Sequence, residues 1–202
     1  AKANHDGSFV WADATDADFA SSANNQFLVR ATGGVSFSTG SGAFLINGGT
    51  VGRYVRTVIV SPVGTATQNG AALLNALAGI SGATASNTYL LKIEPGVYDV
   101  ITSPLTMKPY VDVEGSGELA TRITRAGSAS ETTGTVVGAN NAELRFLTVA
   151  NTGGNNHAKA IYNSFASPRL THVAVSASGG TNSNYGVYNS SSSPTMTLVT
   201  AS

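Results

Sequence analysis

The residues of this sequence that could do chemistry are few, and its one acidic cluster lies near the amino-terminal end. Asp13, Asp16 and Asp18 lie close together, with Asp6 nearby. Carboxylate oxygens at such short spacing can hold a Ca²⁺ ion. The segment lacks the glycine and the closing glutamate of an EF-hand loop, so a solvated or capping role is the alternative. No cofactor is expected, and calcium is the one ion that this cluster could bind.

Two tyrosines of the second half could contact a ligand. Tyr162 and Tyr188 occupy equivalent places in a repeat described below, so their rings are expected to lie one above the other. If they face outward, they offer a flat aromatic surface for a sugar ring. The alternative is that they pack inside the fold or at a bend.

Basic residues of the same region could bind an acidic glycan. Arg145 and Arg169, together with Arg122, Arg125 and Lys159, could line one side of the molecule. Scattered charges in solvent are the alternative. Arg145, Arg169, Tyr162 and Tyr188 are therefore the candidate ligand-binding residues.

The sequence offers no constellation for hydrolysis or elimination. No Asp follows Asp112, and the segment 134–202 contains one carboxylate, Glu143. Glycosidic or ester cleavage by carboxylates needs two acidic groups, and β-elimination needs acidic calcium ligands. A Ser-His-Asp triad cannot be nominated either, and His157 and His172 are expected to be hydrogen-bonded structural residues. We nominate no catalytic residue.

The composition excludes some classes of binding partner for this protein. The 202 residues include 11 Lys and Arg, 11 Asp and Glu, and no Cys, while 42% are hydrophobic. A net charge of zero removes a global attraction to nucleic acid or anionic membranes, and no apolar run is long enough to span a bilayer. A surface of Ser, Thr, Asn and Gly without Cys favours an extracellular, cell-surface or virion-surface location.

The elements that must position these side chains are mostly short strands. Hydrophobic runs bounded by Gly, Asn, Ser and Pro predict strands over 54–60, 89–93, 97–101, 110–113, 144–149 and 170–175. One segment has helical periodicity: over 70–80 the residues Leu73, Leu74, Leu77 and Ile80 form one apolar face. Thr67 or Asn69 is expected to cap the start of this helix, and Gly82 follows its end.

The last fifty residues repeat themselves at an offset of 26 residues. Tyr162, Asn163 and Ser164 align with Tyr188, Asn189 and Ser190 without a gap. The same offset aligns Leu144, Leu147 and Val149 with Leu170, Val173 and Val175. Short strands repeating at this period predict a β-solenoid, in which equivalent residues stack in ladders about 4.8 Å apart. We expect Val173 and Val199 to stack inside and the two asparagines to stack at a bend.

From about Thr57 onward the chain resembles the pectin-lyase-like superfamily, and its first turns are similar to the start of a pectin methylesterase. The segment 93–98 reads Ile-Glu-Pro-Gly-Val-Tyr, and the segments 111–117 and 121–123 follow like the second turn of that family. The resemblance implies a right-handed parallel β-helix whose amino-terminal end is covered by the predicted helix. The catalytic Asp, Arg and Gln set of pectin methylesterases and the calcium ligands of pectate lyases cannot be carried over, because no Asp follows Asp112 and no Gln follows Gln68.

The first fifty residues differ from the rest. The segments 7–13 and 25–35 resemble bacterial and phage trimeric fibre proteins. The apolar strands predicted over 9–11, 26–30, 35–37 and 44–46 are too short to bury themselves in one chain, so we expect them to intertwine with two further copies. The prediction is therefore an intertwined fibre-like β segment over 1–52, followed by a parallel β-helix over 53–202 in a homotrimer.

The expected function is that of an extracellular or virion-surface fibre or adhesin that contacts glycans along the β-helix. The alternative is a polysaccharide-processing enzyme of the pectin-lyase-like kind, such as an esterase, a lyase or a tailspike depolymerase, with catalytic residues outside residues 1–202. Because Ser202 falls in the middle of a turn, we expect the polypeptide to continue or another subunit to cover that end.

Overall fold

The computed structural model divides the chain into two compact units, residues Ala1–Val51 and Gly52–Ser202. It describes residues 1–15, 17–33, 45–46, 49–50, 54–101, 103–126, 132–153 and 156–202. Secondary structure is mostly β, and the described residues contain one helix, α1 (Ala66–Gly79). That helix is too short to cross a membrane. The strand predicted over 35–37 lies outside the described residues, and of the strand predicted over 44–46 the structure describes Leu45–Ile46.

Unit 1 is built from two stacked strands that run in the same direction. β1 (Phe9–Ala12) pairs in parallel with β2 (Phe27–Arg30), and an isolated parallel bridge joins Lys2 to Ala20. All these pairs are 18 residues apart. Gly7 and Asn25 adopt left-handed backbone, with φ angles of 67° and 59°, and are also separated by 18 residues. The chain therefore turns at equivalent points before β1 and before β2. A short antiparallel pair, β3 (Leu45–Ile46) and β4 (Gly49–Thr50), completes the described part.

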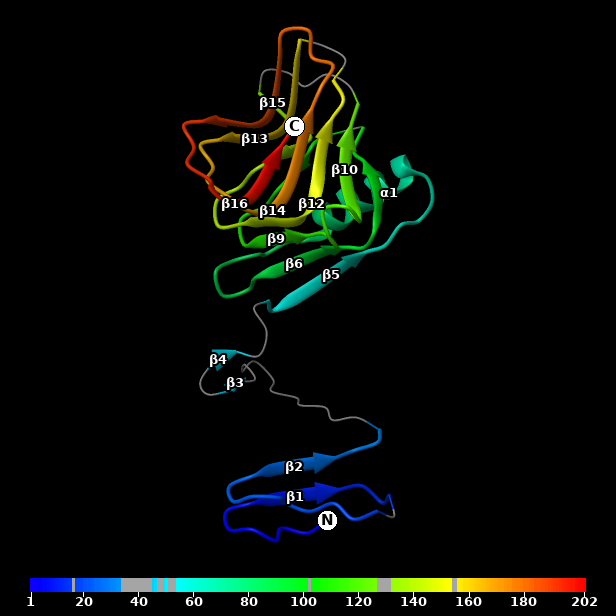
Figure 1. Ribbon diagram of the computed structural model, residues 1–202, viewed down its shortest axis with the longest axis vertical. Helices are drawn as coiled ribbons and strands as arrows, with labels where there is room; N and C mark the ends of the chain where they lie inside the picture. Colours follow the sequence, from blue (N-terminus) through cyan, green and yellow to red (C-terminus); the bar gives the residue numbers. More distant parts are fainter. Residues whose placement is uncertain are drawn as a thin grey trace. The chain divides into compact units, whose positions relative to one another are not determined.

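Unit 2 is a β-solenoid of about four turns (Figure 1). Every named strand pair in it is parallel. Its larger sheet has the order β16-β14-β12-β9-β6-β5, with β10 paired to β12 and β7. The members of this sheet are β5 (Arg56–Val60), β6 (Tyr89–Ile93), β7 (Gly96–Asp99), β9 (Val111–Glu114), β10 (Thr121–Arg125), β12 (Glu143–Asn151), β14 (Arg169–Ala177) and β16 (Thr195–Ala201). The smaller sheet has the order β15-β13-β11-β8 and contains β8 (Leu105–Thr106), β11 (Val136–Val137), β13 (His157–Ser164) and β15 (Ser183–Ser190).

The six strands predicted from the sequence of unit 2 are all present. Strand β6 has the predicted bounds, and the others begin or end within two residues of them. The 26-residue register is also confirmed, since Leu144 pairs with Leu170, Tyr162 with Tyr188 and Val173 with Val199. A constant offset between strands is what stacked turns of equal length produce.

Long strands of the larger sheet bend at a column of left-handed residues. Phe146, His172 and Leu198 have φ angles of 53°, 51° and 52° and are spaced by the repeat. Before the bend β12 pairs with β9, and after it with β10. Because of the bend, the two halves of one strand belong to two different faces of the solenoid. Left-handed backbone is unfavourable for such side chains, so stacking of successive turns must compensate its cost.

The core consists of side chains that alternate inward along each strand. Leu91, Val113, Leu144 and Leu170 form one inward column, and none of the four has exposed surface. Burying one such side chain stabilises the fold by about 1.5–3 kcal/mol. Because the neighbours on either side along the strand point outward, polar residues between these positions are displayed on the outer face.

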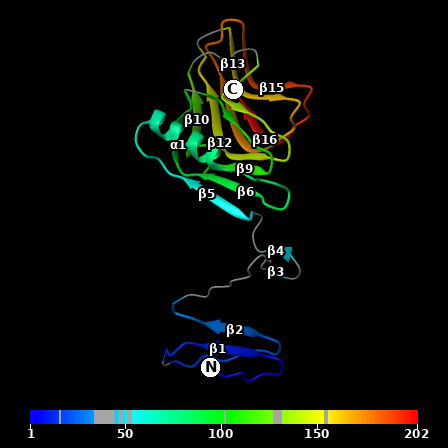
Figure 2. The ribbon, with the colours of Figure 1, turned by 180° about the vertical axis from the view of Figure 1, so that it is seen from behind.

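The helix starts earlier than its apolar pattern predicts. Thr65 is the N-cap and forms a capping box with Gln68, so the expected caps Thr67 and Asn69 are wrong. Asn69 is buried and instead joins the helix to its surroundings. Its Oδ1 accepts hydrogen bonds from Val63 N and Gly64 N, and its Nδ2 donates to Val97 O. Figure 2 shows α1 beside the strands of unit 2.

Candidate functional site

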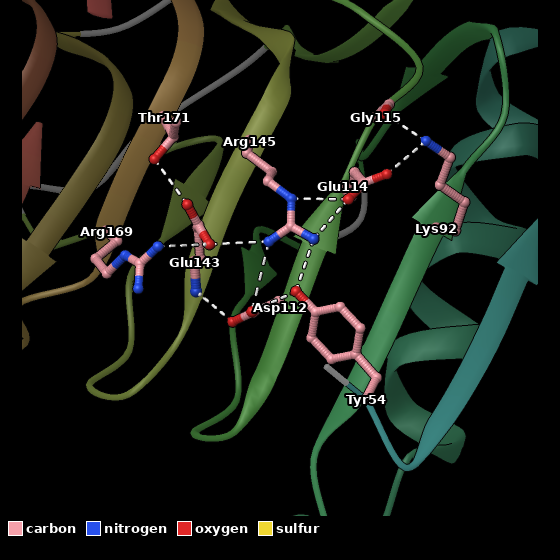
Figure 3. A network of polar contacts seen from close by, with 9 residues as sticks. All are labelled: Tyr54, Lys92, Asp112, Glu114, Gly115, Glu143, Arg145, Arg169 and Thr171. Atoms are coloured by element: carbon pink, nitrogen blue, oxygen red, sulfur yellow. Dashed lines mark hydrogen bonds and ion pairs between the residues drawn. The ribbon is translucent and has the colours of Figure 1, made fainter. Parts of the chain in front are cut away.

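A network of charged and polar side chains covers the outer face of the larger sheet (Figure 3). Parallel pairing aligns Lys92 with Glu114, and Glu114 with Arg145. The next pairing aligns Glu143 with Arg169 and Arg145 with Thr171. Each of these residues is next to an inward leucine or valine along its strand, so their side chains point outward and meet on one surface.

Arg145 is the centre of the network. Its Nε donates to Glu114 Oε2 at 2.7 Å, and its Nη1 donates to Glu143 Oε2 at 2.8 Å. Nη1 also lies 3.5 Å from Asp112 Oδ2. Burial alone would lower the pKa of Arg145, but hydrogen bonds and charge interactions with Tyr54 and Glu114 outweigh it and raise the pKa. This guanidinium is thus a permanent cation with 9% of its side chain exposed.

Tyr54 closes the network at one edge. Its hydroxyl donates to Asp112 Oδ2 at 2.7 Å and accepts from Arg145 Nη2 at 2.6 Å. Burial, followed by the hydrogen bond to Asp112, raises the pKa of Tyr54 to about 12. The phenol therefore stays protonated at neutral pH and cannot act there as a base.

The carboxylates are held by several donors each. Asp112 Oδ1 accepts from Glu143 N at 2.7 Å, and Glu143 accepts from Thr171 Oγ1 at 2.7 Å and from Arg169 Nη2 at 3.1 Å. Lys92 Nζ donates to Glu114 Oε1 at 2.8 Å. Burial works to raise the pKa of Glu114, but hydrogen bonds from Lys92 and Arg145 and their charges hold it below its ordinary value.

The six charged groups of this network neutralise one another. Three cations, Lys92, Arg145 and Arg169, face three carboxylates, Asp112, Glu114 and Glu143. A buried ion pair such as Arg145–Glu143 contributes little net stability, but removing one partner is costly because it leaves an uncompensated charge. The arrangement supplies a rigid outer face with fixed side-chain positions.

The structure brings together two of the predicted ligand-binding residues, Arg145 and Arg169, through Glu143. It also pairs Tyr162 with Tyr188: their ring centroids are 5.7 Å apart and the planes differ by 8°. Tyr162 is only 8% exposed, and the Lys159 ammonium lies 5.3 Å from its ring centroid and 4.6 Å from that of Tyr188. Most of the predicted sugar platform is therefore covered by protein, and Tyr185, 39% exposed, is its most accessible neighbour.

The predicted calcium cluster is described only in part, because Asp16 lies outside the described residues. Asp13 accepts hydrogen bonds from Thr15 N and Thr32 N. The side-chain hydrogen bond of Thr15, followed by those of the Thr32 backbone and side chain, holds the pKa of Asp13 below its ordinary value. Asp18 forms an ion pair with Lys2 at 3.0 Å. Over the described ranges, no three His, Cys, Asp or Glu side chains are grouped to hold a metal ion.

The two histidines of unit 2, His157 and His172, have protein neighbours. His157 Nδ1 lies 2.6 Å from Ser183 Oγ, on the next turn. His172 stacks on Phe146 with ring centroids 5.2 Å apart, at the bend of the strands. The column at this bend is otherwise apolar, as the equivalent positions Phe146 and Leu198 show.

Sequence reasoning missed Tyr54, Lys92, Asp112 and Glu114 as members of one site. The alternation Val111-Asp112-Val113-Glu114 is a signal that two carboxylates share the outer face. Their partners could not be located, because Lys92 and Glu114 are 22 residues apart while Glu114 and Arg145 are 31 apart. Neither spacing equals the 26-residue repeat.

A pocket of about 420 Å³ opens beside this network. It is lined by Asp112, Asn141, Ala142, Glu143, Ser167, Arg169 and Thr195.

Comparisons with family models, with curated proteins and with solved structures found no match to this chain.

Proposed function

We propose that this protein is an extracellular or virion-surface structural protein of the fibre or adhesin kind, which contacts glycans along its β-solenoid. The observation that carries the proposal is the mutual neutralisation of the outer-face charges around Arg145. This arrangement suits a rigid displayed surface better than a reaction centre. Every carboxylate of the network already accepts hydrogen bonds from protein donors, and Arg145 lies between them, where a substrate would have to bind.

Stacked ladders support the structural role. Asn163 Nδ2 donates to Asn189 Oδ1 at 2.8 Å, so equivalent residues of successive turns bond directly. Ladders of neutral side chains avoid the repulsion that stacked like charges would cause. The finer assignment, a right-handed parallel β-helix of the pectin-lyase-like kind with α1 as its cap, rests on the sequence of segments 93–98 and 111–123.

The aromatic face of unit 1 supports self-association. Phe9, Trp11 and Phe27 are 54%, 48% and 67% exposed, and the first and last of these rings stack at 5.0 Å. A two-stranded sheet is marginal by itself in water, so this face gains stability when another chain covers it. The proposed assembly is a homotrimer, because the segments 7–13 and 25–35 resemble trimeric fibre proteins and a closed assembly covers the aromatic face.

The second candidate function is polysaccharide processing. One observation favours it: three carboxylates converge on one arginine, as they could around a polarised substrate bond. Cleavage by two carboxylates needs one of them protonated to serve as the acid. The pKa of Glu114 is shifted in the opposite direction.

Two measurements test the proposal. The intact protein is incubated with pectins and other polysaccharides, and reducing ends, unsaturated products and methanol are measured; we expect none of these. Turnover that disappears in Glu143→Gln would instead establish the enzymatic alternative. Light scattering coupled to gel filtration should give the mass of a trimer, and a stable monomer would refute the assembly.

A further inference from the structure

The pocket beside the charged network lies at the start of three consecutive strands of the larger sheet. Glu143, Arg169 and Thr195 are equivalent residues at the first positions of β12, β14 and β16. Asn141 and Ser167 come from the turns that lead into β12 and β14. The pocket volume of about 420 Å³ falls within the range of small-molecule sites.

Several groups in this pocket have hydrogen-bonding capacity left. Arg169 has 57% of its side chain exposed, and the one hydrogen bond that this side chain forms within the described part of the chain goes from Nη2 to Glu143. The Asn141 amide and the Thr195 hydroxyl are exposed and have no partner among the described residues. The pocket wall therefore offers both donors and acceptors.

The wall is held in place by neighbouring turns. Ser193 N donates to Ser167 Oγ at 2.9 Å, and Ser167 N donates to Asn140 Oδ1 at 2.7 Å. Arg145 and Thr171 donate hydrogen bonds to the Glu143 carboxylate and hold it in place. A ligand would therefore lose little free energy to ordering the turns and Glu143, which are already held in place.

The charges around the pocket select the class of ligand. Asp112 and Glu143 disfavour an anion, and Arg169 disfavours a cation, so the pocket suits an uncharged molecule rich in hydroxyl groups. We propose that it binds a neutral oligosaccharide, whose hydroxyls accept hydrogen bonds from Arg169 and Asn141 and donate to the side-chain oxygens of Asn141 and Thr195. This inference rests on the glycan contact proposed above, and it differs from the sequence-based expectation of an acidic glycan on Arg145 and Arg169.

The test is saturation-transfer NMR on the full chain, with neutral gluco-, galacto- and manno-oligosaccharides as probes. Oligogalacturonates of the same length are the acidic comparison. We expect at least one neutral series to bind and the acidic series to bind more weakly. Affinity should fall about tenfold in Arg169→Ala and in the double variant Asn141→Gly/Thr195→Val, the loss expected for one or two ligand hydrogen bonds.

The variants are chosen to keep the fold. Asn141 has a φ angle of 56°, which glycine adopts readily, and Val is close in shape to Thr. Arg122→Ala, which removes an exposed arginine on β10, is the matched control and should bind as the parent does. Unfolding curves verify that each variant is folded.

The outcomes separate this inference from the proposed function. If neutral sugars bind all variants equally and binding is lost in Tyr185→Ala, the glycan-contact function stands and the pocket assignment is wrong. Preferential binding of oligogalacturonates would overturn the proposed ligand class. Absence of binding by every probe would reject both the inference and the glycan contact.

Discussion

Arg145 Nε and Glu114 Oε2 lie 2.7 Å apart on adjacent strands of the solenoid, although the two residues are 31 positions apart in the chain. The pair joins two turns of unequal length and anchors a network that reaches from Tyr54 to Thr171 (Figure 3). The stability of the outer face should therefore depend on this arginine more than on any exposed charge.

Arg145→Ala should destabilise unit 2 by about 3–5 kcal/mol, because it leaves buried carboxylates without their cation. Urea unfolding followed by circular dichroism measures the change. The exposed Arg122→Ala is the control and should change stability by about 0.5 kcal/mol or less. Equal effects of the two substitutions would contradict a central role for Arg145.

The protein should lose stability in acid partly through Glu114. Its folded-state pKa is lowered below the unfolded value, so its contribution is present above the unfolded pKa, about 4.3, and is lost as the pH falls through the lower folded pKa. Melting temperatures measured across that window should fall less steeply in Glu114→Gln than in the parent. Parallel curves for the two proteins would show that Glu114 is not part of the acid response.

Asp99→Asn should raise the melting temperature slightly at neutral pH. Burial raises the pKa of Asp99, and its Oδ1 is buried without a partner among the described residues. The charged form is therefore disfavoured in the folded state, and the amide mimics the neutral form. The gain should vanish below the ordinary Asp pKa of about 3.9, and a gain that persists there would point to another cause.

Two glycines of α1 should respond in opposite ways to alanine. A Cβ at Gly70 would lie 2.0 Å from Asp99 O, so Gly70→Ala must displace the helix from β7 and should cost about 1–3 kcal/mol. Gly79 has open space around it, and Gly79→Ala should be neutral or stabilise by up to about 1 kcal/mol. Thermal unfolding of both variants checks the contrast, and a harmless Gly70→Ala would show that the helix can shift freely.

The aromatic face of unit 1 should control assembly. Trp11→Ser and Phe27→Ser remove exposed apolar surface from one two-stranded sheet, so the proposed trimer should weaken or dissociate. Light scattering at several protein concentrations measures the mass. Val63→Ser, at a position of unit 2 as exposed as Phe27, is the control and should leave the mass unchanged. An unchanged trimer in Trp11→Ser/Phe27→Ser would place the assembly contacts elsewhere.

The strand register of the last turns was predictable because equivalent residues of successive turns are separated by a constant 26 residues. Leu144, Leu170 and Met196 pair in sequence at an offset of 26, so aligning the chain with itself gives the strand register directly. The start of α1 was less predictable, because the capping box of Thr65 and Gln68 precedes the apolar pattern by a full turn.

The sequence by itself determined the solenoid class, the register of its last turns and the pairing of Tyr162 with Tyr188, because identical turns stack equivalent residues. Only the tertiary structure decided that Tyr162 is largely covered and that Lys92, Glu114 and Arg145 meet. The physical reason is that the earlier turns differ in length, so which outward side chains become neighbours depends on how each loop folds back onto the sheet. No spacing in the chain encodes that outcome.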